Sequence, residues 1–555
     1  MKFFIAFINL LLICLNSTSA DILDVPINFT TIQQAIDSCN SGDTILVAPG
    51  EYRESLVMRR KSIVFASHYI LQADSNKIDS TVLKSSNGTI FNADSCVDSM
   101  IIIGFKIEGS DGDQGGAVYA YNTKVNIRNN YFYFSGAGGW RTGRGGAIYA
   151  LESDLYIAEN RFEYCSADYG GAVYANNSVT VIKNNFFRYN HAQEEGGALR
   201  MGACKVNIEN NTFTQNWGFR SGGAILCGNS EGFIRNNIIL ENIYVDLDSA
   251  GSDYGGGISC SGPNAGTATL RILDNLIEKN TAYSGGGGLT TGNNVLVQNN
   301  LIIANKDGLG SAIYVTGDTR IVNNTIYGNS GYSTIYIKSG GPEITNNIIW
   351  ENKLSNEWKT IFKEPSPGIP VVTYNDIQDG YNDPSNFNSD PLFRNILAND
   401  FHLKTTACGD NSDSPCIDSG SPFYTDSLLY CGAGLGSSLS DIGAYGGGIG
   451  APTTLQNEPD IYPGEFELIK VFPNPFNGQV KIELSIDQPK NISVSIYSLD
   501  GSTIRILYKG QMIAGKKVLL WDGRNEQGIT VSSNVYFVQI ALDAKIYFKK
   551  LLLIK

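Results

Sequence analysis

The sequence predicts an all-β fold in which the chain winds into a parallel β-helix. Two observations support this prediction: a motif of about 25 residues that recurs between residues 115 and 352, and apolar residues that recur at fixed places in each copy. A fixed period of this length is typical of a solenoid, because one repeat cannot bury its apolar face unless it stacks on its neighbours.

Each copy is marked by the second residue of an Asn-Asn, Glu-Asn or Asp-Asn pair. The nine marker residues are Asn130, Asn160, Asn185, Asn211, Asn237, Asn275, Asn300, Asn324 and Asn347. Two steps between markers, of 30 and 38 residues, are longer than the others. These two steps place inserted loops at about residues 136–144 and 242–254.

Three apolar columns accompany the markers, represented in the first copy by Ile127, Phe132 and Val118. Apolar and polar residues alternate around them with period two, which is typical of strands with one buried face. We therefore expect three short strands per turn, with Gly and Asn at the bends. A further Asn column runs from Asn190 to Asn352. It is expected to tolerate left-handed backbone angles and to form a ladder of amide hydrogen bonds.

Composition and charge narrow the possible environments of the protein. The net charge of −13 argues against a nucleic-acid partner, for which a basic surface is expected. Residues 1–20 have the charged, apolar and small-residue regions of a secretory signal peptide, and no later stretch is long and apolar enough to span a membrane. The chain is expected to be a monomer.

The cysteines are expected to fall into two groups. Cys408, Cys416 and Cys431 lie in a Ser-, Gly- and Asp-rich segment, where a disulfide is the expected use in an oxidising compartment. Cys227 and Cys260 share one inward column, so we expect core residues, with a disulfide between them as the alternative. None of the cysteines has the paired close spacing of a zinc site.

Residues 21–450 are expected to form the β-helix, which begins with a short amphipathic helix at residues 31–37. The string from Thr31 through Tyr52 resembles the N-terminal edge of the pectin-lyase-like superfamily. This resemblance implies a right-handed β-helix with an N-terminal capping helix. The segments at 389–393, 414–418 and 441–445 resemble the terminal turns of secreted bacterial β-helix proteins.

Residues 451–463 read as a linker, and residues 464–555 as a small β-sandwich with short alternating strands. The motifs at 471–477, 521–524, 535–537 and 549–555 resemble the C-terminal sorting domain of type IX secretion. That family implies recognition by the secretion machinery and a secreted or outer-surface location. An ordinary sandwich accessory domain is the alternative.

The candidate site lies in the polar segments that precede each Gly-Gly. Equivalent positions of successive turns stack about 4.8 Å apart, so these side chains should gather along one edge. We expect a groove floored by Asp168, His191, Glu194 and Arg220, with Trp140, Tyr169 and Trp217 beside it. An outward column of Tyr119, Tyr149 and Tyr174 could stack on sugar rings, although tyrosine is also a good strand former.

Two functions remain open at this point: a module that binds a polysaccharide or cell-surface glycan, and a lyase of acidic polysaccharides. For a lyase, Arg144, His191 and Arg220 would supply a base and a carboxylate clamp. Asp246, Asp248 and Asp253 could hold Ca²⁺, or could form an acidic loop without an ion. No cofactor is required for binding. Regular repeats without the catalytic strings of polygalacturonases or pectin methylesterases favour binding.

Overall fold

The computed structural model describes two stretches of the chain. The first is residues 21–446 without 73–75, 86–87, 97–98, 139–141, 246–254, 265–268, 307–308, 356–357, 427–428, 430 and 432–434. The second is residues 469–553 without 473–475, 487–489, 499–502, 513–514, 533 and 543–544. The chain divides into two compact units: a long unit of residues 1–67 and 77–459, and a small unit of residues 68–76 and 460–555.

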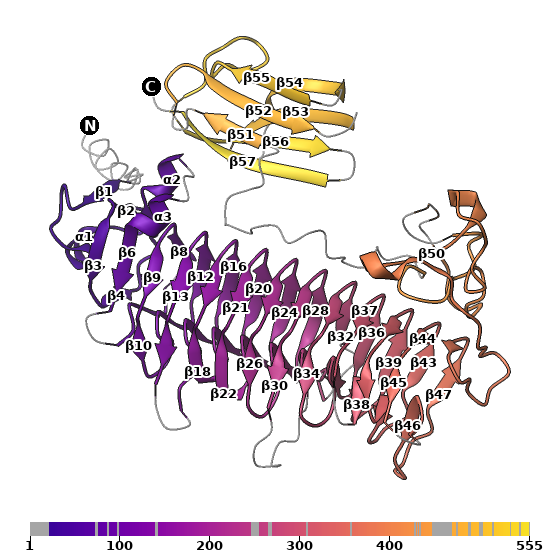
Figure 1. The fold of residues 1–555 in the computed structure, drawn as a ribbon. Coiled ribbons are helices and arrows are strands. Elements are labelled where there is room, and N and C mark those ends of the chain that lie inside the picture. The colour runs from indigo at the N-terminus through magenta and orange to yellow at the C-terminus, as the bar shows by residue number, and fades with distance from the viewer. Residues whose placement is uncertain are drawn as a thin grey trace, which may run out of the picture. The chain divides into compact units, whose positions relative to one another are not determined.

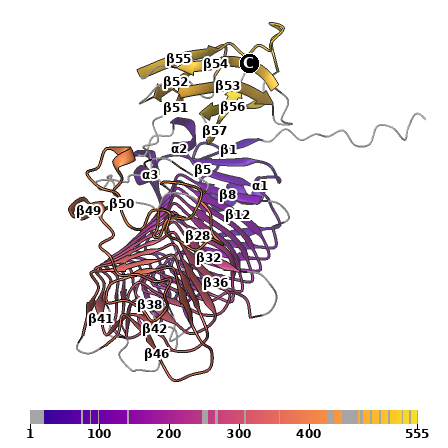
Figure 2. The ribbon, with the colours of Figure 1, turned by 90° about the vertical axis from the view of Figure 1, so that its right-hand side faces the viewer.

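The long unit is a right-handed parallel β-solenoid, as predicted (Figure 1). Within the described residues, sheet A has 14 strands, from β1 (Ile22–Val25) to β47 (Val371–Thr373). Sheet B has 13, from β3 (Gly50–Arg53) to β48 (Asp376–Ile377), and sheet C has 12, from β4 (Leu56–Arg59) to β46 (Ile361–Lys363). The end-on view in Figure 2 shows the strands stacked turn upon turn.

A fourth parallel sheet, sheet D, was not expected from the sequence. Its strands are β10 (Asp111–Gly112), β14 (Gly136–Ala137), β18 (Ser166–Tyr169), β22 (His191–Glu195), β26 (Trp217–Gly218), β30 (Ile243–Tyr244) and β34 (Thr281–Ala282). They occupy the polar segments between sheets B and C, where we expected no strand. The prediction of three strands per turn is therefore wrong for these seven turns, each of which has four strands.

The core is built from the apolar columns identified in the sequence. Ile127, Phe132 and Val118 and their equivalents in the later copies are fully buried. Phe132, Phe162, Phe187 and Phe213 stack in register, with ring centroids 4.7 Å apart in each step. In-register stacking confirms that each turn lies flat on the one before it.

The glycine pairs allow the turns to approach closely before sheet C. Gly170 has a φ of +65°, which L side chains rarely adopt. A Cβ on the following Gly171 would lie 2.1 Å from the carbonyl oxygen of Gly197 in the next turn. The first Gly of each pair is therefore needed for its left-handed backbone angle, and the second because the next turn leaves no room for a Cβ.

Two asparagine ladders run through the bends of the solenoid. In both columns, each amide Nδ2 donates to the Oδ1 of the equivalent Asn one turn on, as from Asn160 to Asn185 at 3.0 Å and from Asn190 to Asn216 at 2.9 Å. The expected ladder is thus confirmed. The expected left-handed angles belong instead to the residue just before each ladder Asn, for example Tyr189 with φ +55°.

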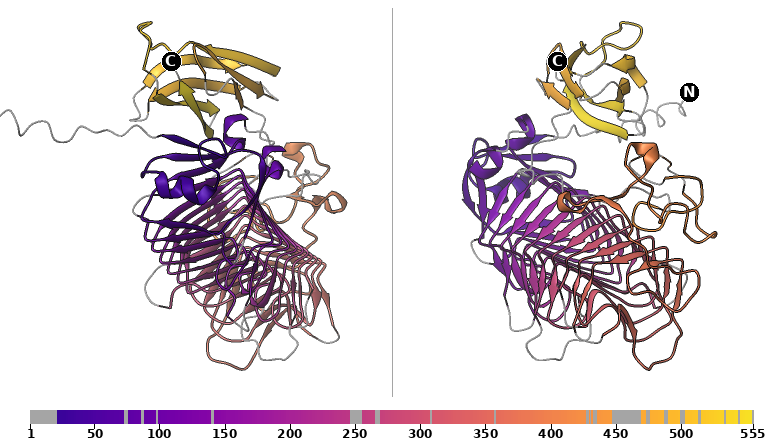
Figure 3. Two further views of the ribbon diagram at one scale, coloured as in Figure 1. Left: turned by 90° about the vertical axis from the view of Figure 1, so that its left-hand side faces the viewer. Right: turned by 45° about the vertical axis from the view of Figure 1, so that its right-hand side comes forward.

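The helix α1 (Ile32–Ser38) lies near the start of the solenoid, where a short helix was expected (Figure 3). Its N-terminus is capped by Thr31 and by the Glu54 carboxylate, which accepts hydrogen bonds from two backbone N–H groups of the first turn. Ile32, Ala35 and Ile36 join the core cluster of the solenoid. Two further short helices are α2 (Tyr69–Gln72) and α3 (Asn76–Ser80).

Residues 389–446, here called the covering segment, do not form terminal turns of the solenoid as we expected. The segment contains the antiparallel pair β49 (Phe393–Asn395) and β50 (Asp400–Leu403). Phe393, Phe401 and Leu403 pack on apolar side chains of the outer face of sheet B, such as Leu301 and Ile348. The right-hand view of Figure 3 shows the segment beside the strands.

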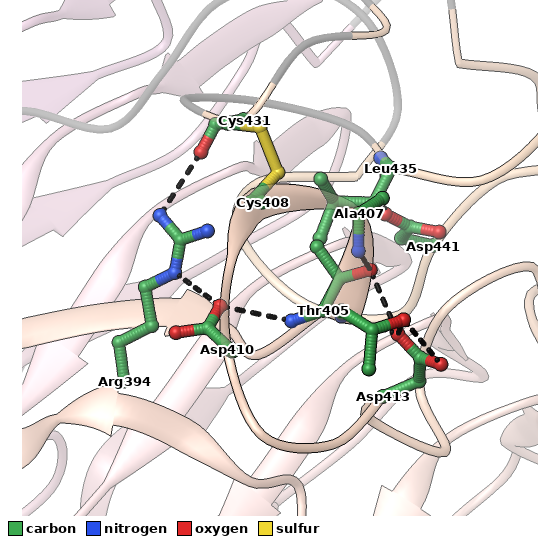
Figure 4. The surroundings of a disulfide bond; sticks show 10 residues. Arg394, Thr405, Ala407, Cys408, Asp410, Asp413, Cys431, Leu435 and Asp441 are labelled. Atoms are coloured by element: carbon green, nitrogen blue, oxygen red, sulfur yellow. Dashed lines mark hydrogen bonds and ion pairs between the residues drawn. A yellow bond between two sulfur atoms is a disulfide. The ribbon is translucent and has the colours of Figure 1, made fainter.

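One disulfide, Cys408–Cys431, closes a loop of the covering segment (Figure 4). It confirms the expected use of cysteines in this region, although Cys416 is buried and free. Arg394 lies beside the disulfide, where it pairs with Asp410 at 2.9 Å and donates to the carbonyl of Cys431. Cys227 and Cys260 are free and buried, as expected of core residues.

Residues 469–553 of the small unit form two antiparallel sheets. One contains β51 (Ile469–Phe472), β52 (Val480–Ile486) and β55 (Gly515–Trp521). The other contains β53 (Lys490–Ser498), β54 (Thr503–Met512), β56 (Asn534–Leu542) and β57 (Lys545–Leu553). Trp521 and Phe476 lie in its buried core. Among the described residues of both units, no helix has the length and apolar character needed to cross a bilayer.

Candidate functional site

The candidate site is built on the outward side chains of sheet D. The strand register places Gly136, Ser166, His191, Trp217 and Ile243 in one column. Along the solenoid, the column therefore changes from small residues to the rings of His191 and Trp217 and then to Ile243. The inward column beside it is small, as with Ala167 and Ala192, which lets the sheet lie close to the core.

A pocket of about 170 Å³ lies over the small residues of this column. It is lined by Gly136, Ala137, Gly138, Ser166, Ala167, Asp168, His191 and Gln193. The recess exists because the two turns at Gly136 and Ser166 have almost no side chain where the next turn has an imidazole. Asp168 and His191 were predicted to share a groove, and they do line the same pocket.

His191 forms the wall of the pocket toward the later turns. Trp217, one turn on, stacks on the imidazole with ring centroids 3.6 Å apart and planes 14° apart. Burial lowers the pKa of His191 to about 4, against the opposing charge of Asp168, so the ring is neutral at pH 7. Its buried Nε2 has no hydrogen-bond partner among the described residues.

Asp168 supplies a carboxylate at the floor of the pocket. It is 3% exposed, and its Oδ2 accepts a hydrogen bond of 2.8 Å from the backbone N–H of Gly143. This bond holds the carboxylate in place and ties the turn at Gly143 to the next one. The exposed Gln193 adds an amide at the rim.

The two arginines predicted with His191 lie outside the pocket lining. Arg220 pairs with Glu194, with Nε 2.9 Å from Oε2, and Glu194 is 6% exposed. Arg144 lies over the ring of Tyr174, 5.6 Å from its centroid. The predicted groove floor is therefore divided into a pocket with Asp168 and His191, and a separate Glu194–Arg220 ion pair.

The tyrosine column of sheet C does not present open ring faces. Tyr119, Tyr149 and Tyr174 stack on one another with centroids 5.5 and 5.4 Å apart. Tyr149 is 4% exposed and Tyr174 is 8% exposed. The premise that this column is an exposed platform is thus wrong for these two residues. Tyr169, at the end of β18, aligns with Arg144 and Glu195 in the neighbouring turns and is not part of the pocket lining.

Some predicted site residues lie outside the described part of the chain. These are Trp140 and the three acidic residues Asp246, Asp248 and Asp253. Ca²⁺ binding by that loop stays a prediction. Among the residues that the structure describes, no three His, Cys, Asp or Glu side chains form a group that could hold a metal ion.

Three residues of the pocket lining, Gly136, Ser166 and Gln193, were not among the predicted site residues. Gly136 and Ser166 lie two residues, and Gln193 four residues, after the left-handed residue of the bend between sheets B and D, and these positions were readable from the repeat. Only the register of sheet D, however, places the two small residues side by side and next to His191.

Two family models match parts of the chain. The model described as right handed beta helix region matches residues 142–309 and 249–378. The model described as secretion system C-terminal sorting domain matches residues 470–555. Among curated proteins, no match to the chain was found.

Solved structures with some similarity include PorZ, a surface component of the type IX secretion system of Porphyromonas gingivalis. It is 26% identical with a TM-score of 0.13, over 16% of this chain and 12% of that one. The PL6 family alginate lyase AlyGC is 14% identical with a TM-score of 0.39, over 82% of this chain and 62% of that one. A pectin methylesterase bound to a hexasaccharide is 14% identical with a TM-score of 0.16, over 63% of this chain and 89% of that one.

These similarities are too low to bear on activity, but the matches to the family models agree with the two units of the structure. The C-terminal match implies recognition by the type IX secretion machinery and export to the cell surface or beyond. The chain therefore combines a right-handed parallel β-helix with a type IX secretion sorting domain.

Proposed function

We propose that the protein is a secreted or cell-surface glycan-binding protein, and that the pocket on sheet D holds one sugar unit of a polysaccharide. The observation that carries the proposal is the recess over Gly136 and Ser166, bounded by the His191–Trp217 stack. Ligand pockets typically combine an apolar or aromatic wall with a few fixed polar groups. Here the wall is an imidazole supported by an indole, and the polar groups are Asp168 and Gln193.

The chemistry of this lining suits a sugar ring. One face of a pyranose is largely C–H and packs on an aromatic ring, while its hydroxyl groups donate to a carboxylate such as that of Asp168. Trp217 covers one side of the imidazole, and the pocket lies on the other side, toward Ser166 in the turn before. Because His191 is neutral at pH 7, it contributes a ring face without attracting an anion.

Filling the pocket tests this proposal. Ser166 is exposed, so Ser166→Trp should fold normally and occupy the recess. The control is Val179→Trp, at a 47% exposed strand position of sheet A. With a panel of neutral and acidic polysaccharides in affinity electrophoresis, we expect Ser166→Trp to weaken binding at least about tenfold, a change of about 1.4 kcal/mol. Val179→Trp should bind as the wild type does. Equal binding by both variants, or no binding by the wild type, would refute the proposal.

A lyase that acts by β-elimination is the second candidate. One observation favours it: the neutral His191 has a buried Nε2 with no hydrogen-bond partner among the described residues, as a general base requires. Two observations count against it. The pKa of about 4 makes this imidazole a weak base, and Arg220 is already paired with Glu194. Elimination creates an unsaturated sugar, so a rise in ultraviolet absorbance that is lost in His191→Ala would establish this activity in place of simple binding.

A further inference from the structure

The bend between sheets B and D carries an aromatic column that the sequence prediction did not identify. Phe134, Tyr164 and Tyr189 occupy equivalent places in three successive turns, each two residues before the outward column of sheet D. We call these three residues the aromatic corner. Their φ angles are +51°, +55° and +55°, in the left-handed region.

Bulky residues in the left-handed region are unusual and carry a cost of about 1–2 kcal/mol each. The fold does not require rings here, since the same place is occupied by Gly109 in the preceding turn and by Gly328 further along. The left-handed angle recurs at this place in other turns, for example at Gln215 and Glu241, so the angle belongs to the bend and not to the rings. The informative feature is that three successive turns carry aromatic side chains here.

The aromatic corner is open on its outer side. Phe134 is 55% exposed and Tyr164 is 40% exposed. The three rings stack on one another with centroids 5.0 Å apart in both steps. Tyr133 supports the first two rings edge-on, with a centroid 4.6 Å from that of Phe134.

Among the described residues, no ring stacks on the face of Phe134 at the early end of the stack. Tyr164 covers the face of Phe134 toward the later turns. On the other side the equivalent residue is Gly109, and a Cβ placed there would meet no atom within 4 Å. At the late end, Arg188 lies 4.5 Å from the centroid of Tyr189 and covers that ring.

The same bend is treated differently later in the solenoid. There the equivalent residue Ala304 packs against the cluster that includes Phe401 of the covering segment. The chain thus buries its own apolar bend in that half. Within the described residues, nothing covers the rings of Phe134 and Tyr164 in the same way.

We infer that the aromatic corner is a second subsite for the glycan, on which a sugar ring stacks on the free face of Phe134 while the neighbouring unit occupies the pocket. This inference rests on the proposed function. Its main support is continuity, because a single residue separates Phe134 from Gly136, and Tyr164 from Ser166, in the pocket lining. The ligand class is a chain of pyranose units with an accessible C–H face, held by at least two adjacent units.

The test is the double variant Phe134→Asn/Tyr164→Asn. Asn accepts the left-handed backbone angle, so the substitution removes the rings without disturbing the bend. The matched control is Glu351→Asn, at the same place in a distant turn with φ +53°. Binding of a disaccharide and a hexasaccharide from the best-bound polysaccharide is measured by calorimetry, together with the melting temperature.

We expect the double variant to bind the hexasaccharide about tenfold more weakly, since stacking contacts of this kind contribute about 0.5–1.5 kcal/mol each. Its melting temperature should stay within a few degrees of the wild type, because lost stacking and relieved strain oppose each other. Glu351→Asn should leave both properties unchanged.

Three results would overturn the inference. Hexasaccharide affinity that is unchanged in the double variant but lost in Ser166→Trp would leave the pocket as the only subsite. A large drop in melting temperature without a change in affinity would make the aromatic corner a structural feature. Absence of glycan binding by the wild-type protein would reject the proposed function and this inference together.

Discussion

The outer surface of sheet B differs between its early and late turns, although the inner face is apolar and buried throughout. In the early turns the outer side chains are polar or aromatic, such as Tyr133 and Arg188, and the bend at Phe134 is exposed. In the late turns they are apolar, such as Leu301 and Ile303, and the covering segment packs on them.

This difference shows that inward and outward columns are under separate constraints. Inward residues must match from turn to turn, because each packs on its equivalent one turn away. Outward residues are free to change, so a solenoid can present a ligand surface on one stretch and a self-covered surface on another. The early stretch is therefore where we place binding, and the late stretch where we place stabilisation of the terminal turns.

The largest expected effect is on the covered half. Phe401 is 1% exposed in the cluster between the covering segment and sheet B. Phe401→Ala should lower the free energy of unfolding by about 3–5 kcal/mol, measured by urea denaturation. Phe134→Ala, at a 55% exposed position, is the matched control and should change stability by less than about 1 kcal/mol. Equal losses in both variants would contradict the division of the surface into covered and open halves.

Loss of the disulfide should have the next largest effect. Cys408 and Cys431 are 23 residues apart, and a loop of this length corresponds to about 3 kcal/mol of stabilisation. The double variant Cys408→Ser/Cys431→Ser should therefore expose residues 389–446 to limited proteolysis while the early turns stay resistant. Reductant should reproduce this pattern in the wild type and have no further effect on the variant. Cleavage spread evenly over the solenoid would argue that the segment is not a separate cover.

The two halves should respond to pH in opposite directions. Burial raises the pKa of Asp441 to about 7 and that of Asp376 to about 6. Their contribution to the free energy of unfolding is therefore complete below pH 4 and is lost as the pH rises through these values. The lowered pKa of His191 gives the opposite pH dependence. Its contribution to the free energy of unfolding is present above pH 6.5 and is lost as the pH falls toward 4.

Hydrogen exchange, corrected for the intrinsic rate, can measure this contrast. Between pH 5 and pH 8, the free energy of opening should fall by about 2 kcal/mol in peptides at 414–445. It should rise in peptides at 186–195. Asp376→Asn should weaken the first trend, leaving the part that is due to Asp441, and should leave the second unchanged. Parallel trends in both regions would contradict the assigned carboxylates and imidazole.

Much of the solenoid could be predicted because its core residues repeat in sequence. The columns of Ile127, Phe132 and Val118 and the Asn ladders need no knowledge of the rest of the chain. The covering segment could not be predicted as such, because Phe401 and Leu301 are 100 residues apart and share no repeat. The left-handed bends were misassigned by one residue, since rings such as those of Phe134 and Tyr164 gave no turn signal.

The site was predictable only in part. Asp168 and His191 were identified from their types and position in the repeat. The recess itself depends on side chains that are small, Gly136 and Ser166, and a missing side chain gives no chemical signal in a sequence. The pairing of Arg220 with Glu194 also required the register of the turns, because either side chain could equally have faced a ligand.

The most direct measurement is a crystal structure of the protein with a hexasaccharide from the polysaccharide that it binds best. We predict density for one sugar ring over Gly136 and Ser166 against the imidazole of His191, and for the adjacent ring on the free face of Phe134. Density for the sugar on another face of the solenoid, with the recess empty, would contradict this prediction.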